Sequence, residues 1–549
     1  VQFQSTCDTE VLLVGWQLEG PRFLQKLRGM FAFAIWDREK GRGYLARDAF
    51  GIKPLYAAER AGEVLFASEV RSLLATGRIE CALSSPAVAS YLYTGSVAEP
   101  LTIIEGILAV PPGCVVEVTP RNGGFETSPP ERFIAAFSAS EDIHRDPPSH
   151  VHRVRNALRE SVRYHLVSDV PVAVFLSGGI DSSAVAGLAS EVAGTRLESF
   201  TVTFSEKDYS EAKPARDAAE RFNTRHHEIL LSGRDLLNAL PDVFAAMDQP
   251  SLDGLNTFVV SRAVRAFGIK VVLSGLGGDE LFGGYPSFPR ARYMAPLWKM
   301  PAALRQVGAL GTRPIADLRA QRMRAVMSEH SPAFAAYRAS RTLFSEKQLQ
   351  ELTGTAYEDD SAMHRQPDDI DVSRLSLMQQ VSLYELTGYM RNTLLRDSDV
   401  FSMAHALELR VPFVDLEVAR VAGSAAESMR IKHGAPKPVL VEAVRDLLSP
   451  ETIDRPKTGF TLPFETWMRN EMFAEVDSVL KGIRPESVGL NPSAVAQVWS
   501  QFQGRRPGVN WSRPWALYTL VRWAAQNGLA ETAKNVESIT PEMTLSAAG

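Results

Sequence analysis

The amino-acid sequence predicts an α/β protein with two parts of different construction. From about residue 150 onward, short apolar runs alternate with helix-forming segments, which is the pattern of a parallel sheet covered by helices. Two of these runs, residues 172–176 and 269–273, are each followed directly by a glycine-rich turn. Residues 1–118 instead hold strand-like runs separated by turns, and the pattern is mainly helical after residue 290.

The order of the predicted elements divides the chain into two domains. Strand-like runs in the first part include residues 30–36 and 43–46. Residues 119–149 are rich in Pro, Gly, Ser and charged residues, so they are interpreted as a linker. A helical pattern over residues 152–165 then leads into the first apolar run of the second part. The predicted domains are residues 1–118 and 150–545.

The composition is that of an ordinary globular protein. Of the 549 residues, 45% are hydrophobic and 22% are charged, and the formal net charge is −5. This charge argues against a general nucleic-acid or membrane-surface binder, and no apolar run reaches the length of a membrane span. The first residues lack a signal-peptide pattern. Three scattered cysteines do not suggest a disulfide framework or a zinc site, so we expect a cytoplasmic protein.

Residues 177–183, SGGIDSS, carry the strongest chemical signal. They lead from an apolar run into a helix-forming segment, so backbone N–H groups and the positive end of a helix dipole are available to an anion. Gly178 and Gly179 permit positive φ and close approach of the backbone to phosphate. Hydroxyl donors are added by Ser177, Ser182 and Ser183. The alternative is a simple Ser/Gly-rich connector.

Asp181 lies inside this phosphate-binding turn, which lacks the Gly-Lys-Ser/Thr ending of a Walker A loop. A carboxylate repels phosphates unless a cation lies between them. The sequence therefore predicts Mg²⁺ carrying the phosphates of ATP.

The SGGIDSS turn resembles the pyrophosphate-binding loop of the ATP-pyrophosphatase superfamily, whose members cleave ATP to AMP and pyrophosphate. Within that superfamily, the chain is similar to asparagine synthetases of the glutamine-hydrolysing type. Three more segments carry the resemblance: LSGLGGDELFGGY at 273–285, DSDVFSMAHALELRVPFVD at 397–415 and RPKTGF at 455–460. The resemblance implies a Rossmann-like parallel-sheet domain followed by a mainly helical region.

The resemblance also assigns roles to single residues. Asp181 and Asp279 are the candidate Mg²⁺ ligands, and Lys457 is expected to stabilise charge on the α-phosphate as pyrophosphate leaves. Without the resemblance, the surroundings of Lys457, a loop with Pro and Gly, favour its interpretation as a solvated surface lysine. The candidate ATP-binding residues are Leu176, Ser177, Gly178, Gly179, Asp181, Ser182, Ser183, Val202, Ser274 and Gly275.

The region for the acid substrate is expected in the third segment. Its candidate residues are Arg396, Asp399, Glu408 and Arg410. A structural ion-pair cluster beneath the site is the alternative interpretation. Leu276 stands where many family members have a glutamate that is a candidate base for ammonia, so Glu280 is a candidate replacement.

The first part of the chain is similar to the glutaminase domain of class II amidotransferases, which is an αββα sandwich. The similar segments are TCDTE at 6–10, GMFAFAIWD at 29–37, ARDAFGIKPLY at 46–56 and FASEVRSLL at 66–74. By the family pattern, Asp8 holds the amino group of glutamine.

This part lacks the terminal cysteine that serves as nucleophile in that family, because the sequence begins with Val1. We therefore interpret it as a truncated glutaminase domain and expect no glutaminase activity from these residues alone. Cys7 is a weaker candidate nucleophile, because it has no terminal amine to activate it.

The resemblance implies an ATP-dependent ligase that adenylates the side-chain carboxylate of aspartate and transfers ammonia from glutamine to give asparagine. Its partners are expected to be small molecules, and a homodimer is possible in this family. Two alternatives stay open. One is a relative that acts on a larger carboxylic acid, as β-lactam synthetases and lasso-peptide cyclases do. The other is a non-catalytic relative that only binds nucleotide.

Overall fold

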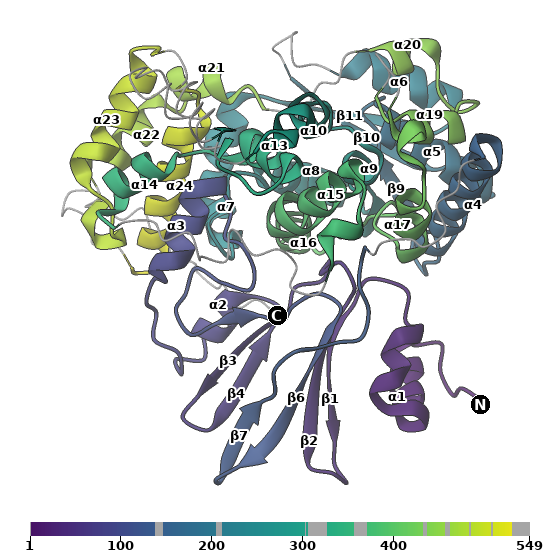
Figure 1. Ribbon diagram of the computed structural model, residues 1–549, viewed down its shortest axis with the longest axis horizontal. Helices are drawn as coiled ribbons and strands as arrows, with labels where there is room; N and C mark the ends of the chain where they lie inside the picture. Colours follow the sequence, from purple (N-terminus) through teal and green to yellow (C-terminus); the bar gives the residue numbers. More distant parts are fainter. Residues whose placement is uncertain are drawn as a thin grey trace, which may run out of the picture.

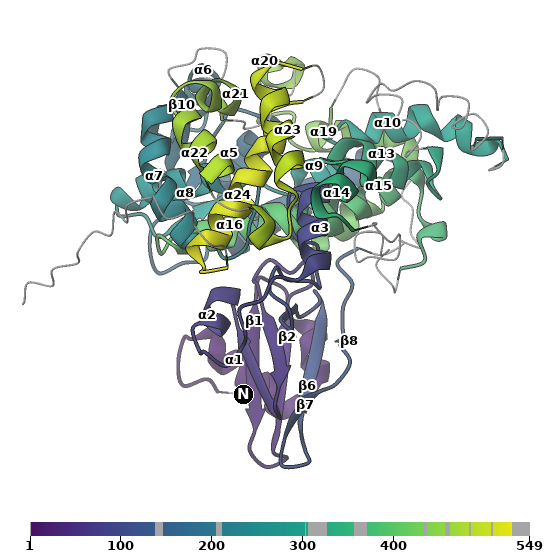
Figure 2. The ribbon, with the colours of Figure 1, turned by 90° about the vertical axis from the view of Figure 1, so that its left-hand side faces the viewer.

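The computed structural model describes residues 2–137, 146–204, 211–301, 304–305, 327–355, 370–431, 436–455, 462–482, 485–506 and 509–529. Residues 2–137 are called the N-terminal part and residues 146–529 the C-terminal part. In Figure 1 the sheets of the N-terminal part lie below the C-terminal part, in which helices surround a central sheet. Figure 2, from the side, shows the same two-level arrangement.

The N-terminal part is built on two antiparallel sheets. One has the order β1-β2-β6-β7, with β8 also paired to β6, and the other has the order β4-β3-β5. These strands are β1 (Ala32–Asp37), β2 (Arg42–Arg47), β3 (Tyr56–Arg60), β4 (Glu63–Ala67), β5 (Leu108–Ala109), β6 (Cys114–Arg121), β7 (Gly124–Thr127) and β8 (Glu131–Arg132). The helices are α1 (Asp8–Glu19), η1 (Gly20–Lys26), α2 (Val70–Leu74) and α3 (Ser85–Thr94). Helix α3 reaches up into the C-terminal part, where the Tyr91 hydroxyl donates to the carbonyl of Ala516.

The predicted linker, residues 119–149, contains regular structure. Strands β7 and β8 both pair with β6, so the N-terminal sheet continues to Arg132, beyond the predicted boundary. The hairpin turns at Asn122 and Gly123, which both have positive φ. Asn-Gly between two strands is a strong hairpin signal, and the Pro- and Ser-rich surroundings obscured it. Helix α4 (Pro147–His165) also begins inside the predicted linker, where the Asp146 side chain caps its first turn.

The C-terminal part contains a five-stranded parallel sheet of order β11-β10-β9-β12-β13. Its strands are β9 (Val172–Phe175), β10 (Glu198–Phe204), β11 (Arg225–Leu231), β12 (Val271–Leu273) and β13 (Glu408–Arg410). The predicted runs at 172–176 and 269–273 are thus the neighbouring strands β9 and β12. The chain adds β10 and β11 on one side of β9 and β12 and β13 on the other, so the strand order reverses between β9 and β12. In open α/β sheets, ligands bind at the carboxyl ends of strands at such a point.

Helices surround this sheet and make up the rest of the described chain. Helix α4 packs against α5, α17 and α19, whereas α8 packs against α7 and α16. The fully buried Trp467, Trp515 and Trp523 belong to the core of the last helices. Helices between residues 180 and 282 and between 396 and 454 are α5 (Ile180–Val192), α6 (Ala212–Arg221), α7 (Gly233–Ala246), α8 (Leu255–Ala266), α9 (Gly278–Phe282), α16 (Arg396–Met403), α17 (Leu416–Gly423), α18 (Glu427–Arg430), α19 (Pro438–Ala443) and α20 (Pro450–Asp454). The others are α10 (Ser287–Met294), η3 (Ala295–Lys299), α13 (Pro332–Arg341), α14 (Glu346–Thr353), η4 (Val372–Arg374), α15 (Leu377–Glu385), the π-helix η5 (Leu386–Leu395), α21 (Phe464–Arg469), α22 (Phe473–Gly482), η6 (Pro485–Val488), α23 (Pro492–Gln503) and α24 (Ser512–Gln526).

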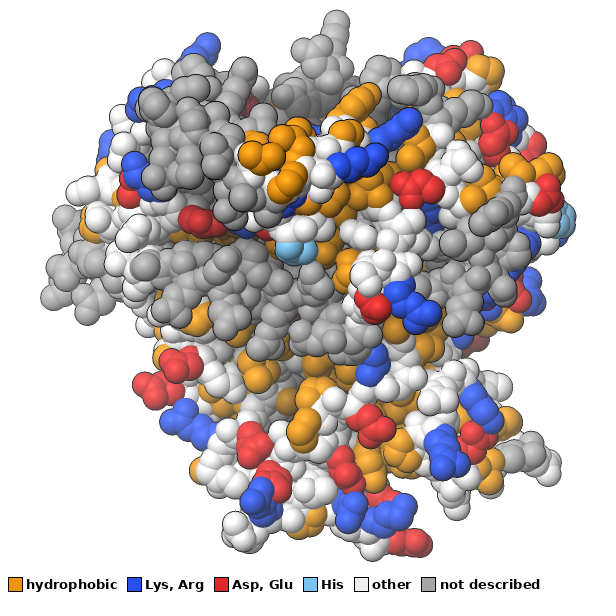
Figure 3. Space-filling model, in the orientation of Figure 1, with side chains coloured by type: hydrophobic (Ala, Val, Ile, Leu, Met, Phe, Trp, Pro, Cys, Tyr) orange, Lys and Arg blue, Asp and Glu red, His pale blue; other side chains and the backbone are white. Residues whose placement is uncertain are grey.

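These sheets confirm the predicted fold class, a mixed α/β protein with a parallel-sheet second part and a helical remainder. Within the described residues, no helix combines the length and apolar character needed to cross a membrane. Acidic and basic side chains are interspersed over the N-terminal sheets on the face in Figure 3.

Candidate functional site

Two turns meet at the point where the strand order reverses. The first turn follows β9 and leads into α5. Gly178 has a φ of +69°, and a Cβ atom there would lie 2.4 Å from the backbone of Pro214. This position therefore requires glycine. The Ser177 and Ser182 hydroxyls are 2.9 Å apart and tie the turn to the first turn of α5.

The second turn follows β12 and leads into the short helix α9, which carries Asp279 and Glu280. Gly277 has a φ of +100°. A Cβ on Gly278 would lie 2.5 Å from Oδ1 of Asp181. The two turns are thus packed so closely that Asp181 and Asp279 converge, although they are distant in sequence.

A cavity of about 580 Å³ opens beside these turns. The sequence-predicted residues that line it are Leu176, Ser177, Asp181, Ser182, Val202, Ser274, Gly275, Asp279 and Glu280. Gly178, Gly179 and Ser183 shape the first turn and the start of α5 without contributing to the described lining. Leu276, the departure from the family pattern, also lines the cavity.

Lys437, which the sequence did not single out, lies between the two aspartates. Its Nζ atom lies 2.5 Å from Oδ1 of Asp279 and also contacts Oδ2 of Asp181. Burial alone would lower the pKa of the Lys437 ammonium, but the charges of Asp181 and Asp279 raise that pKa above its usual value. Asp181 and Asp279 therefore converge on the Lys437 ammonium, and their assignment to Mg²⁺ stays a prediction.

Glu280 is almost completely buried and accepts a hydrogen bond of 2.8 Å from the Tyr285 hydroxyl. Burial, together with the neighbouring charge of Asp279, raises the pKa of Glu280 to about 7. The Arg341 guanidinium lies over the rings of Tyr285 and Tyr389. Its Cζ atom is 4.3 Å from the centroid of the Tyr285 ring and 3.6 Å from that of the Tyr389 ring. Both tyrosines line the cavity.

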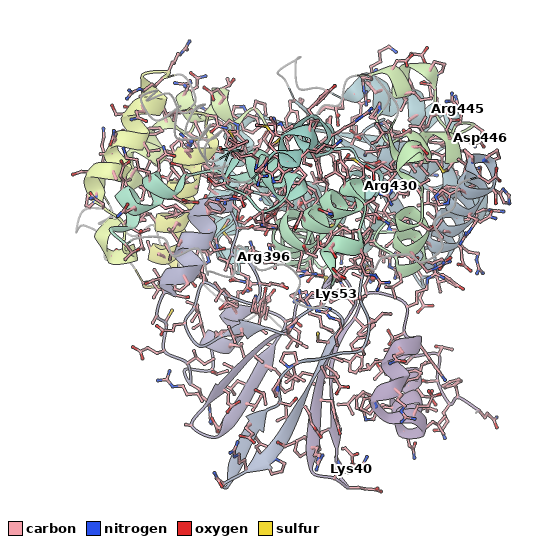
Figure 4. The ribbon with its side chains drawn as sticks, in the orientation of Figure 1. Lys40, Lys53, Arg396, Arg430, Arg445 and Asp446 are labelled. Carbon is pink, nitrogen blue, oxygen red and sulfur yellow. The ribbon has the colours of Figure 1, made fainter. Side chains whose placement is uncertain are left out.

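The four residues predicted for the acid substrate form two separate groups in the structure. Lys53, from the N-terminal part, binds Asp399 at 2.7 Å, and the Arg396 guanidinium donates to the carbonyl of Val97 at 3.3 Å. Figure 4 shows Lys53 and Arg396 near the boundary between the two parts. Arg410 instead pairs with Glu408 and donates to the carbonyls of His165 and Val167.

None of these four side chains belongs to the described lining of the cavity. Their neighbour Asp397 does line it. Burial raises the pKa of Asp397 to about 7. The motif thus contributes to the cavity through a residue that the sequence did not single out.

Asp8 and Cys7 do not belong to the described lining of the cavity. Asp8 is exposed in the first turn of α1, and Cys7 precedes it as an exposed N-cap residue with its Sγ 3.6 Å from the Asp8 carboxylate. Lys457 falls outside the described residues. Its neighbour Arg455 is described and donates to the carbonyl of Gly178 at 3.0 Å, so this segment begins beside the first turn.

The N-terminal part contributes directly to the cavity wall. Thr94 and Gly95 line it, and the Gly95 carbonyl accepts from the N–H of Leu252. A second cavity of about 840 Å³ lies between residues of both parts, and it shares Thr94, Tyr389 and Thr393 with the first. The two cavities therefore adjoin.

Comparison with known proteins agrees with this arrangement. Residues 153–525 match the asparagine synthase family, and residues 1–129 match the glutamine amidotransferase domain. The chain belongs to the asparagine synthase family. This membership confirms the resemblance on which the site assignments were based.

Three curated relatives illustrate the range of the family. A putative glutamine-hydrolysing asparagine synthetase of Mycobacterium tuberculosis is 32% identical over 85% of this chain and 72% of its own length. Asparagine synthetase [glutamine-hydrolyzing] 1 of Bacillus subtilis is 31% identical over 87% of this chain and 75% of its own. A protein named amidase chry2, from Gibberella zeae, is 27% identical over 89% of this chain and 78% of its own. Relatives named as synthetases and as an amidase are therefore similar to this chain over most of its length.

Proposed function

We propose that this family member is an ATP-dependent amide ligase that converts aspartate to asparagine. An oxygen of the side-chain carboxylate of aspartate attacks the α-phosphorus of ATP, and pyrophosphate leaves. Ammonia then attacks the acyl carbon of the aspartyl-adenylate and loses a proton, and the acyl C–O bond breaks so that AMP leaves with its electron pair. Glutamine is the proposed source of ammonia, with Asp8 holding its amino group.

The observation that carries the proposal is the convergence of Asp181 and Asp279 beside two glycine turns. These turns lie where the strand order of the parallel sheet reverses, between β9 and β12, which is called the switch point of the sheet. Two carboxylates fit Mg²⁺, because phosphate and water oxygens complete its octahedral shell. The glycine at 278 leaves the space beside Asp181 that such a ligand set needs. A bound Mg²⁺ would neutralise phosphate charge and orient the leaving pyrophosphate.

The chain's own groups supply the remaining chemistry. Backbone N–H groups at the start of α5 face the phosphates, and Leu176 and Val202 contact the nucleoside. Lys457 stabilises charge on the α-phosphate as pyrophosphate leaves. Glu280 is buried in the cavity wall with a pKa of about 7, which suits a group that exchanges a proton with the incoming ammonia.

A second candidate is the amidation of a different carboxylic acid. Leu276 gives the cavity an apolar side chain where many family members have a glutamate. An apolar residue at this position favours an acid substrate with an apolar group nearby.

Incubation of the full chain with ATP, Mg²⁺, aspartate and ammonium chloride tests the proposal. We expect AMP, pyrophosphate and asparagine in equal amounts, and none of them after chelation of Mg²⁺. Ammonium replaces glutamine, so the outcome does not depend on glutaminase activity. Formation of ADP and phosphate would contradict the adenylation chemistry. AMP formation that needs an acid other than aspartate would favour the second candidate.

A further inference from the structure

The Lys437 ammonium lies where a cation bound to both Asp181 and Asp279 would lie. We propose that Lys437 is a built-in counter-ion of the metal site. It holds the two carboxylates together when Mg²⁺ is absent and competes with Mg²⁺ for the same oxygens. This inference rests on the proposed function, because it takes Asp181 and Asp279 to be the Mg²⁺ ligands.

Charge balance is the first argument. The side chains of Asp181 and Asp279 are each 19% exposed, and that of Lys437 is 5% exposed, so water screens this group poorly. Two carboxylates brought this close repel each other unless a cation lies between them. Lys437 supplies one positive charge, which leaves the three side chains together with a net charge of −1. The site remains attractive to a divalent cation but is less attractive than two bare carboxylates.

The backbone at Lys437 is the second argument. Its φ of +49° and ψ of +52° place a non-glycine residue in the left-handed region. The next residue is Pro438, the first of α19, and residues before proline normally adopt an extended conformation. Such a conformation persists only where surrounding contacts determine it. Here the contacts at the end of the side chain are the ion pairs with Asp181 and Asp279.

The space around the lysine side chain is the third argument. A Cβ on Gly284 would lie 2.4 Å from Cε of Lys437 and 1.8 Å from Oδ1 of Asp279. Gly284 therefore leaves room for the lysine stem to reach the carboxylates. The stem lies against Gly284, in the loop that follows α9, so one short segment carries Asp279 and borders the lysine stem.

The position of the ion pairs distinguishes a competing counter-ion from an ordinary buried salt bridge. Asp181 and Asp279 both line the cavity at the switch point of the sheet, where a ligand can reach them. A metal ion that binds both carboxylates must displace the ammonium, because both cations use the same two oxygens. Free Mg²⁺ should therefore bind weakly to the unmodified chain.

Binding of Mn²⁺, a spectroscopic substitute for Mg²⁺, tests this competition directly. Electron paramagnetic resonance of free Mn²⁺ is measured in the absence of nucleotide for the unmodified chain and for Lys437→Met. Removal of the ammonium should tighten Mn²⁺ binding at least tenfold. Adding Asp181→Asn to Lys437→Met should remove most of that gain, because one of the two ligands is lost.

Lys53→Met is the matched control, since Lys53 also binds an aspartate but does not belong to the described lining of the cavity. Mn²⁺ binding by this control should equal that of the unmodified chain. If Lys437→Met is too unstable to purify, Lys437→Gly removes the charge and relieves the left-handed backbone at once. It should also bind Mn²⁺ more tightly and should melt at a higher temperature when Mn²⁺ is added.

Unchanged or weaker Mn²⁺ binding by folded Lys437→Met or Lys437→Gly would overturn the counter-ion proposal. If the unmodified chain then still forms AMP from Mg²⁺–ATP, the proposed function stands without it. If instead the variants gain metal affinity but no AMP forms under any condition, the counter-ion stands and the proposed reaction fails. The two inferences are thus separable.

Discussion

Two groups of lysine and aspartate in this chain have the same chemistry and different surroundings. Lys437 lies buried between Asp181 and Asp279, at the carboxyl edge of the parallel sheet beside the cavity. Lys53 binds Asp399 across the boundary between the N-terminal and C-terminal parts, and both side chains are partly exposed. An ion pair therefore does not mark a functional site by itself. The position of the pair at the switch point makes the first one a candidate for chemistry and leaves the second as a contact between the two parts.

The largest difference in the rate of AMP formation is expected when one carboxylate is removed from each group. Asp181→Asn should lower the rate of AMP formation by about a hundredfold or more, because the proposed Mg²⁺ site loses one of its two carboxylates. Raising the Mg²⁺ concentration should restore part of the rate. Asp399→Asn should change the rate by less than about threefold, since Asp399 does not belong to the described cavity lining.

Steady-state assays of pyrophosphate release measure both variants. An Asp399→Asn rate as low as that of Asp181→Asn would show that the sequence-based assignment of Asp399 to the acid substrate is correct. The conclusion that only the group around Lys437 takes part in catalysis would then be wrong.

Lys457 offers a second catalytic test, although it lies outside the described residues. Negative charge builds on the α-phosphate as pyrophosphate leaves, so a cation placed there stabilises the transition state more than bound ATP. Lys457→Ala should therefore lower kcat by about a hundredfold and alter the KM for ATP much less. Near-normal kcat in a variant with a normal melting temperature would identify Lys457 as a surface residue.

The sequence predicted those parts of the site that depend on local pattern. Val172–Phe175, the glycine turn and Asp181 follow one another along the chain, so a strand, a turn and a helix start could be inferred together. Lys437 gives no local signal, because a lysine before a proline is usually a surface residue and its left-handed backbone depends on tertiary contacts. The pairing of Asp399 with Lys53 also depends on how the two parts of the chain pack together. The hydrophobic periodicity of the sequence does not predict that packing.

Asp248 extends the comparison to another contact between the parts. Its carboxylate, in the C-terminal part, accepts the N–H groups of Val70 and Arg71 at the start of α2, both at 2.9 Å. Burial raises the pKa of Asp248 from 3.8 to about 6, despite these hydrogen bonds. Because the folded-state pKa lies above the unfolded value, the stabilising contribution is present below about pH 4 and is lost as the pH rises through about 6.

Urea unfolding between pH 4 and 7.5 measures this dependence. One pKa unit corresponds to about 1.4 kcal/mol, so Asp248 should account for a loss of at most about 3 kcal/mol over this range. Asp248→Asn, which does not titrate, should show a flatter curve than the unmodified chain. Parallel curves for the two proteins would mean that Asp248 is ionised at little cost in the folded state.

The smallest effect is expected from Lys53→Met, which opens the Lys53–Asp399 pair and leaves the cavity unaltered. The side chains of Lys53 and Asp399 are 23% and 15% exposed, so water and salt screen their attraction more than they screen that of Lys437. Partly exposed pairs of this kind contribute about 1 kcal/mol or less. Lys53→Met should therefore lower the free energy of unfolding by no more than this amount, and 0.5 M NaCl should reduce the difference further. Urea unfolding at low and high salt measures both effects. A loss of several kcal/mol that salt does not reduce would show that the boundary pair is held as tightly as Lys437 is by Asp181 and Asp279.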